Sequence, residues 1–184
     1  MIANAGIAAS APLDKTDRSL WDQIIAVNLT GPFQTLREGL ARMKAAHCRQ
    51  GRLIAIASMT AKRAYPYISA YAASKHGVLG LVKSAALEVA ALGTSGSESE
   101  QKNITVNAIC PGYLDTEMTQ SSIANIAEKT GLSSVQAAEK LHSFSPQKRL
   151  FTADEVAQAA LYLASPAASG INGQALSIDG GETW

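Results

Sequence analysis

The sequence predicts an α/β fold in which helices cover a parallel β-sheet. Three short runs are continuously apolar, as strands buried on both faces of a sheet are. Longer stretches with helical periodicity separate these runs, and a chain that alternates strand and helix forms a parallel sheet with right-handed crossovers. The length of 184 residues fits one domain, and 47% hydrophobic residues is enough to build its core.

The expected strands are short and partly β-branched. They span Arg52 to Ala57 (RLIAIA), Ile104 to Ile109 (ITVNAI) and Gln174 to Ile178 (QALSI). Ile2 and Ala3, just before Asn4-Ala5-Gly6, are the candidate stub of a fourth strand.

The first expected helical region runs from Leu20 to His47. Its apolar residues recur at helical spacing, but Pro32 lacks a backbone N–H and would break a simple helix. The pattern alone therefore allows either two helices or one helix with a kink.

Further helices follow in the second half of the chain. The stretch from Ser69 to Leu92 is apolar on two faces, so we expect it to contact the sheet and a further surface, such as a second subunit. After it, Thr94 to Gln101 (TSGSESEQ) is polar and predicts a solvated loop within one domain. Two capping boxes predict helix starts at about Ser134 and Ala153: Ser133 with Gln136, and Thr152 with Glu155.

The composition argues against several classes of function. Lys and Arg number 16 against 15 Asp and Glu, so a net charge of +1 offers no attraction to nucleic acid or to an anionic membrane. We expect no membrane-spanning helix, because no run of about 18 residues is wholly apolar, and no secretory signal at the N-terminus. Cys48 and Cys110 are too few for a disulfide framework, which indicates reduced thiols in a cytoplasmic protein. The three histidines share no metal-ligand spacing, so we predict no metal site.

Tyr71 and Lys75 are the first candidates for chemistry. They are four residues apart in the expected helix, so they lie on one face, one turn from each other. A tyrosine with a pKa near ~10 is a poor base at neutral pH, but a nearby ammonium favours the phenolate and lowers that pKa. The pair can therefore supply a general acid or base, although a Tyr and a Lys at this spacing are more often plain surface neighbours.

Ser58 directly follows the expected strand Arg52 to Ala57. Open parallel sheets bind ligands at the carboxyl ends of their strands. The Ser58 hydroxyl is thus a candidate to hydrogen-bond the oxygen of a reacting carbonyl beside the Tyr71 phenol. The alternative is a strand-ending serine that caps backbone groups.

Six short motifs, which include Ser58, Tyr71 and Lys75, are distributed over the whole chain. They are NAG at 4–6, NLTG at 28–31, Ser58, YAASK at 71–75, NAICPG at 107–112 and DGG at 179–181. Each is weak alone, but their order and spacing closely resemble those of the short-chain dehydrogenase/reductase family. The resemblance implies a doubly wound parallel sheet of the Rossmann-like type, and a single helix that bends near Asn28, which accommodates Pro32.

The resemblance also implies roles for individual residues. Tyr71 would donate or accept the proton at the substrate oxygen, and Ser58 would polarise that oxygen. Lys75 would lower the pKa of Tyr71 and hydrogen-bond the nicotinamide ribose, while Asn28 would hold a water in a proton relay from Lys75 to solvent. The implied cofactor contacts are Asn4, Ala5, Gly6, Tyr71, Lys75, Pro111, Gly112, Tyr113, Leu114 and Thr116.

The implied reaction is hydride transfer between NAD or NADP and a small molecule with a carbonyl or secondary alcohol. The region from NAG to YAASK resembles 3-oxoacyl or 3-hydroxyacyl thioester reductases as well as hydroxybutyrate and sugar-alcohol dehydrogenases, and it does not rank them. Residues 117–145 correspond to the family's variable substrate lid. Tyr65, Tyr67 and Tyr113 flank the site, either as the lining of a substrate pocket or as surface aromatics. The two longest helices resemble the pair buried in family dimers, which implies a homodimer or homotetramer.

Two family features are missing from the 184 residues. One is the glycine-rich TGxxxGxG turn that seats the pyrophosphate, and the other is the residue after the second strand that selects NAD or NADP. We therefore expect a sheet truncated on its N-terminal side, a Met1 that is internal to a longer protein, and no activity from this chain alone. The alternative is a truncated non-catalytic paralogue that serves only as a subunit partner or is an inactive fragment. Retention of Asn28, Ser58, Tyr71 and Lys75 together favours the enzyme.

Overall fold

The computed structural model describes residues 1–93 and 102–183, so the expected loop Thr94 to Gln101 lies outside the described residues. Within these residues the structure has four strands: β1 (Ile2–Ala3), β2 (Gln50–Ile56), β3 (Asn103–Pro111) and β4 (Ala175–Ile178). The helices are α1 (Arg18–Ile25), α2 (Gly31–Ala45), α3 (Ser69–Gly93), α4 (Glu117–Thr130), α5 (Ser134–His142) and α6 (Ala153–Ala164). A π-helical turn, Ala26–Thr30, joins α1 to α2, and short 3-10 turns span Leu13–Lys15, Met59–Ala61 and Pro166–Ala168.

The four strands form one parallel sheet in the order β1-β2-β3-β4. In its register, Ile54 of β2 lies between Ile2 of β1 and Asn107 of β3. The four strands expected from the sequence are confirmed, with end points that differ by a few residues. Because all strands run the same way, their carboxyl ends meet at one edge of the sheet.

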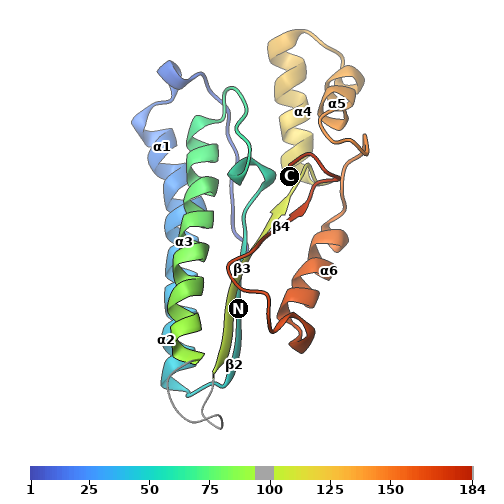
Figure 1. The fold of residues 1–184 in the computed structure, drawn as a ribbon. Coiled ribbons are helices and arrows are strands. Elements are labelled where there is room, and N and C mark those ends of the chain that lie inside the picture. The colour runs from blue at the N-terminus through green and yellow to red at the C-terminus, as the bar shows by residue number, and fades with distance from the viewer. Residues whose placement is uncertain (94–101, 184) are drawn as a thin grey trace.

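Helices cover both faces of the sheet, as the doubly wound fold requires (Figure 1). The helices α2 and α3 pack on one face and α6 on the other. Successive residues of β2 supply the two cores, since side chains of a strand alternate between faces: Leu53 points to α2 and α3, and Ile54 points to α6. The first core includes Leu36, Val78, Val82 and Val106, and the second includes Ile109, Val156 and Leu163.

The helical region around Pro32 is one helix with a π-helical turn. The segment Ala26–Thr30 carries Asn28 and leads directly into α2, where Pro32 occupies the first turn. A π turn widens the backbone spiral locally, so the proline's missing N–H falls where the regular hydrogen-bond pattern is already interrupted. The expectation of a single bent helix is confirmed.

By length and composition alone, α3 is the one described helix that could cross a membrane. Its apolar sequence has another cause in this fold, because Val78, Val82 and Val89 pack in the core against the sheet. Its outer side carries the exposed Lys83, Ser84 and Glu88, and Leu87 there is 76% exposed. Both apolar stripes of the helix, including Leu79 and Ala86, lie in this one core, so the expected second apolar surface is not confirmed.

Residues 117–145 form a helical hairpin at the edge of the domain. The helices α4 and α5 pack through Ile123, Ala137 and Leu141 (Figure 1). Ser133 and Thr152 make the expected capping boxes, each accepting a hydrogen bond from the backbone N–H three residues on. These caps start α5 and α6 at the predicted residues.

Candidate active site

The carboxyl edge of the sheet collects the residues that the motifs single out. Asn4 to Gly6 follow β1, Ser58 follows β2, and Pro111 to Thr116 leave the end of β3. Tyr71 and Lys75 lie in the first two turns of α3, which packs against the sheet beside β3. Parallel strands thus bring together residues that are far apart in the sequence.

Tyr71 and Ser58 are neighbours at this edge. The hydroxyl of Ser58 lies close enough to the Tyr71 phenol to lower its pKa. Burial has the larger effect, so the pKa of Tyr71 is raised overall. Ser58 also caps the backbone, since its Oγ accepts from the N–H of Thr60 at 3.1 Å. The capping interpretation of Ser58 is therefore confirmed, and its role at a substrate oxygen stays a prediction.

Lys75 is a buried cation, only 3% exposed. Its ammonium donates to the backbone oxygen of Ile56 at 3.1 Å, which fixes it at the end of β2. The Nζ lies 5.8 Å from the centroid of the Tyr71 ring. Burial lowers the pKa of Lys75 to about 8. The lowering of the Tyr71 pKa by Lys75 stays a prediction.

Asn28 is completely buried in the π-helical turn and holds the segment after β1. Its Oδ1 accepts from the N–H of Ile7 at 2.9 Å, and its Nδ2 donates to the oxygen of Ile7 at 2.9 Å. The same Nδ2 lies 3.3 Å from Oγ of Ser74, one residue before Lys75. A methyl group at Gly6 would lie 3.5 Å from Lys75 Nζ and 3.6 Å from Asn28 Oδ1, so these three residues are immediate neighbours.

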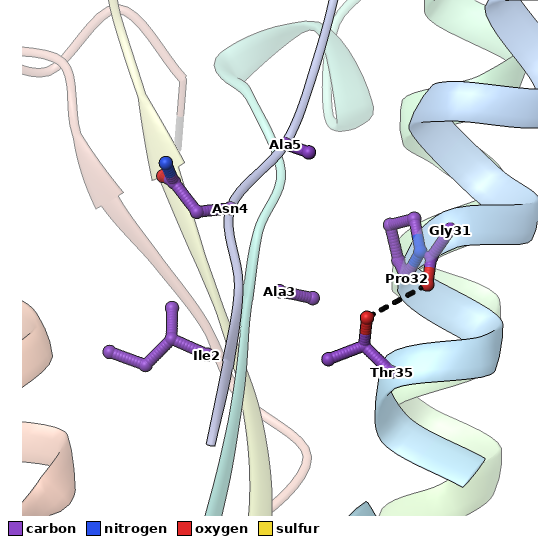
Figure 2. A pocket seen from close by; sticks show the side chains of 7 residues that line it. All are labelled: Ile2, Ala3, Asn4, Ala5, Gly31, Pro32 and Thr35. Carbon is purple, nitrogen blue, oxygen red and sulfur yellow. Dashed lines mark hydrogen bonds between the residues drawn. The ribbon is translucent and has the colours of Figure 1, made fainter. Parts of the chain in front are cut away.

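The predicted cofactor residues after β1 border a pocket of about 310 Å³. Asn4 and Ala5 line it together with Ile2, Ala3, Gly31, Pro32 and Thr35. Figure 2 shows that Ala3 and Ala5 point toward α2, whereas Ile2 and Asn4 point to the opposite side of the strand. The pocket does not include Tyr71 or Ser58, so it lies beside the catalytic candidates.

The predicted cofactor residues after β3 form a turn against the C-terminal strand. Gly112 donates its N–H to the oxygen of Ile178 at 2.9 Å, and Leu114 makes a β-bridge with Phe151. Thr116 then occupies the N-cap position of α4, where its side chain makes no capping hydrogen bond. This turn therefore links the sheet edge to the predicted lid.

Three residues near this site were not singled out from the sequence as functional. Ser74 is fully buried between Asn28 and Tyr71, whose backbone oxygen accepts from its hydroxyl at 2.7 Å. Glu182 is 4% exposed and accepts a hydrogen bond from Tyr65. Lys62 donates to Ser177 at 2.8 Å. Of these three residues only Glu182 has a signal in the sequence, because it is the acidic residue directly after the DGG motif. Within the described residues, no three His, Cys, Asp or Glu side chains gather as metal ligands would.

Comparison with known proteins identifies the family. Residues 1–183 match the family model described as enoyl-(acyl carrier protein) reductase. The chain is 39% identical over its whole length to D-beta-hydroxybutyrate dehydrogenase of Rhizobium meliloti, covering 67% of that relative. The chain belongs to the short-chain dehydrogenase/reductase family. It is also 34% identical to a 3-oxoacyl-(acyl-carrier-protein) reductase of Thermotoga maritima, over 98% of the chain and 64% of the relative.

Solved structures of the short-chain dehydrogenase/reductase family share the fold. Sorbitol-6-phosphate 2-dehydrogenase from Erwinia amylovora superposes with a TM-score of 0.87 at 31% identity, over 98% of this chain and 66% of that one. Actinorhodin polyketide ketoreductase, solved with NADPH, gives a TM-score of 0.85 at 31% identity, again over 98% and 66%. The chain thus spans about two thirds of the length of the relatives it matches.

The residues present fit the nicotinamide ribose end of NAD or NADP. An ammonium has three N–H donors, and Lys75 makes one hydrogen bond to the described residues, so two donors remain for ribose hydroxyls. Because Lys75 is buried, those two donors need partners that bulk water does not supply. The glycine-rich turn that binds the pyrophosphate does not occur among the 184 residues, so the fit concerns this end of the cofactor alone.

Proposed function

We propose that the protein is an NAD(P)-dependent oxidoreductase that interconverts a carbonyl and a secondary alcohol on a small molecule. The observation that supports this best is the grouping of Ser58, Tyr71, Lys75 and Asn28 at the carboxyl edge of the sheet. A subunit partner without catalysis has no physical need for a buried lysine with unused donors beside a tyrosine that neighbours a serine.

The proton chemistry belongs to Tyr71. In the direction of reduction its hydroxyl donates a proton to the developing alkoxide, and in the direction of oxidation its phenolate accepts the alcohol proton. Ser58, whose hydroxyl lies near the Tyr71 phenol, donates to the same substrate oxygen and stabilises its negative charge. When bound, nicotinamide supplies or accepts the hydride.

Lys75 and Asn28 assist the proton transfer by Tyr71. The ammonium of Lys75 holds the ribose hydroxyls and favours the phenolate of Tyr71 by its charge. Asn28, tied to Ile7 by two hydrogen bonds, orders the water through which Lys75 exchanges protons with solvent.

Three further assignments belong to this proposal. The α4–α5 hairpin acts as the substrate lid, because the turn Pro111 to Thr116 connects it to the site. The protein forms a homodimer or homotetramer through α2 and α3, whose outer sides carry Phe33 (44% exposed) and Leu87 (76% exposed). The protein is cytoplasmic, since Cys48 and Cys110 are both free thiols.

The test uses the protein purified from its natural source. It is incubated with NAD⁺ or NADP⁺ and a panel of secondary alcohols that includes 3-hydroxybutanoate and C4–C6 alditols, and reduced nicotinamide is followed by its absorbance. The proposal expects turnover of at least one alcohol with one of the two cofactors. Absence of cofactor binding in titration calorimetry, together with absence of turnover, would favour the non-catalytic subunit.

A further inference from the structure

A buried carboxylate that the proposed mechanism leaves unused lies near the C-terminal end of the chain. Glu182 is 4% exposed, and its Oε1 accepts a hydrogen bond from the hydroxyl of Tyr65. The other oxygen, Oε2, is fully buried and has no hydrogen-bond partner within residues 1–93 and 102–183. Such an oxygen is costly to leave unpaired, so it points to a donor that another molecule supplies.

The turn that carries Glu182 is fixed by its neighbours. Asp179 accepts hydrogen bonds from the N–H of Gly181 at 3.1 Å and from the N–H of Thr183 at 3.0 Å. Thr183 in turn lies 3.1 Å from the hydroxyl of Ser177. Glu182 therefore sits on a preorganised turn, which is what a recognition group needs.

This turn packs against the turn Pro111 to Thr116 of the proposed active site. A methyl group at Gly112 would lie 3.1 Å from the Cα of Asp179, so the two segments touch. The next residue, Tyr113, has its pKa raised to about 12, mainly by burial and then by the charges of Glu182 and Tyr71. Since Gly112 touches Asp179 and directly precedes Tyr113, the turn with Glu182 lies beside the segment that leaves the end of β3.

An aromatic cluster adjoins the carboxylate through Tyr65. The ring of Phe144, at the end of the lid hairpin, makes an edge contact with Tyr65 at 5.6 Å between centroids. It stacks on Tyr113 at 6.2 Å. Three rings from three different segments thus form one cluster that reaches Glu182 through Tyr65, and Phe144 in it is 38% exposed. Such rings offer apolar faces to a carbon skeleton, with one polar acceptor among them.

The chemistry of the site favours a hydroxyl over a carboxylate. Burial raises the pKa of Glu182, and a hydroxyl suits either protonation state because it both donates and accepts. A second carboxylate in the same buried place would be repelled by an ionised Glu182 and by the nearby Asp179.

We propose that Glu182 and Tyr65 recognise a hydroxyl of the substrate other than the one that reacts, so that the enzyme prefers neutral polyols and hydroxyketones to hydroxy acids. This inference rests on the proposed oxidoreductase function and adds its substrate class. The free Oε2 accepts from the substrate hydroxyl, and the rings of Tyr113 and Phe144 contact the adjoining carbons.

The kinetic test compares substrates that differ by one hydroxyl. The protein is expressed from its complete gene, and kcat/KM is measured for ribitol, 5-deoxyribitol and 3-hydroxybutanoate. We expect ribitol to exceed 5-deoxyribitol by about tenfold to a hundredfold, since a site built to bind a hydroxyl rejects the analogue that lacks it. Glu182→Leu should bring this ratio to about one by lowering kcat/KM for ribitol alone. The matched control is Asp154→Leu, which removes an exposed carboxylate from α6, outside the proposed lid, and should leave the ratio unchanged.

Two further measurements separate recognition from a structural role. If Glu182→Leu lowers the Tm but keeps the ribitol preference, Glu182 only ties the turn to Tyr65 and the inference is overturned. Titration calorimetry of ribitol into the Tyr71→Phe variant, with cofactor present, needs no turnover. Binding that is lost when Glu182→Leu is added supports the inference even where the proposed reaction fails, and equal binding with and without Glu182 contradicts it. If neither variant binds ribitol, the substrate class proposed here is wrong, whatever the turnover of other alcohols.

Discussion

Asn28 and Ile7 are joined by a pair of hydrogen bonds that only an amide side chain can make. Oδ1 accepts from the Ile7 N–H and Nδ2 donates to the Ile7 oxygen, both at 2.9 Å. The arrangement anchors the segment after β1, next to Gly6 and Lys75, on the π-helical turn. The Asn28 side chain thus holds the predicted cofactor segment after β1 next to the buried Lys75.

The first prediction follows from this pair. Asn28→Asp keeps an acceptor for the Ile7 N–H but sets a carboxylate oxygen against the Ile7 carbonyl, so we expect the free energy of unfolding to fall by about 1–3 kcal/mol. Urea denaturation measures this loss. The matched variant is Asn107→Asp, because Asn107 makes the same two kinds of bond with Ile171 and Gln174. Both variants should be destabilised, whereas only Asn28→Asp should change the pH profile of kcat; an unchanged profile would argue against the proton relay.

The second prediction concerns the reacting phenol. Tyr71→Phe removes the hydroxyl that moves the substrate proton, and kcat should fall by about 10²- to 10⁴-fold. Cofactor affinity, measured by calorimetry, should stay nearly the same because Lys75 is untouched. Tyr162→Phe is the control, since Tyr162 lies 48% exposed on α6, away from the site. Normal turnover by the Tyr71 variant would refute the assigned mechanism.

The third prediction uses the buried charge of Lys75. Burial lowers its pKa to about 8 from an ordinary value of 10.5. Below pH 8 Lys75 is charged in the folded protein, and the burial of that charge lowers the free energy of unfolding. Between pH 8 and 10.5 the folded protein has lost this proton while the unfolded chain still binds it, so the free energy of unfolding rises with pH and the cost disappears. Lys75→Met should therefore be more stable than the wild type by up to about 3 kcal/mol near neutral pH. The difference should shrink between pH 8 and 10.5, as measured by urea denaturation at several pH values.

The same substitution should weaken cofactor binding and turnover, so that stability and function change in opposite directions. A Lys75→Met protein that is less stable than the wild type at pH 7 would show that the ammonium gains more from its contacts than burial costs it.

Much of this architecture could be predicted from the sequence because its signals are local. Continuous apolar runs predicted the strands. The capping boxes at Ser133 and Thr152 predicted two helix starts, since each box depends on residues within one helical turn. A single helix with a bend near Asn28 was predicted only through the family resemblance, because Pro32 alone is compatible with a break or a bend, and its π-helical form was not predicted. Glu182 was missed because its partner Tyr65 is 117 residues away and no local pattern links the two. Contacts of that kind depend on how the loops pack, which spacing along the chain does not encode.

The fourth prediction compares the two helix caps. Thr152→Ala and Ser133→Ala each remove the side chain that accepts the N–H of the third helical residue, at a cost of about 1 kcal/mol. Thr152 starts α6, which covers one face of the sheet, so its loss should lower the global free energy of unfolding. Ser133 starts α5 in the hairpin, where we expect faster hydrogen exchange confined to residues 134–142. A global loss from Ser133→Ala equal to that from Thr152→Ala would show that the hairpin unfolds together with the core.

The last prediction concerns assembly. The side chain of Leu87 is 76% exposed on the outer side of α3, and Gly80 on the same helix has no atom within 4 Å of where a methyl group would be. An exposed leucine on the same side as a glycine that leaves room for a neighbouring side chain can pack against a second copy of itself, as an isologous interface requires. Leu87→Lys places two cations at such an interface, so sedimentation velocity should show a shift toward monomer. Val135→Lys changes a residue that is 68% exposed on α5 and should sediment like the wild type. If Leu87→Lys leaves the sedimentation coefficient unchanged, the subunits do not meet through α3, and its exposed leucine needs a different explanation.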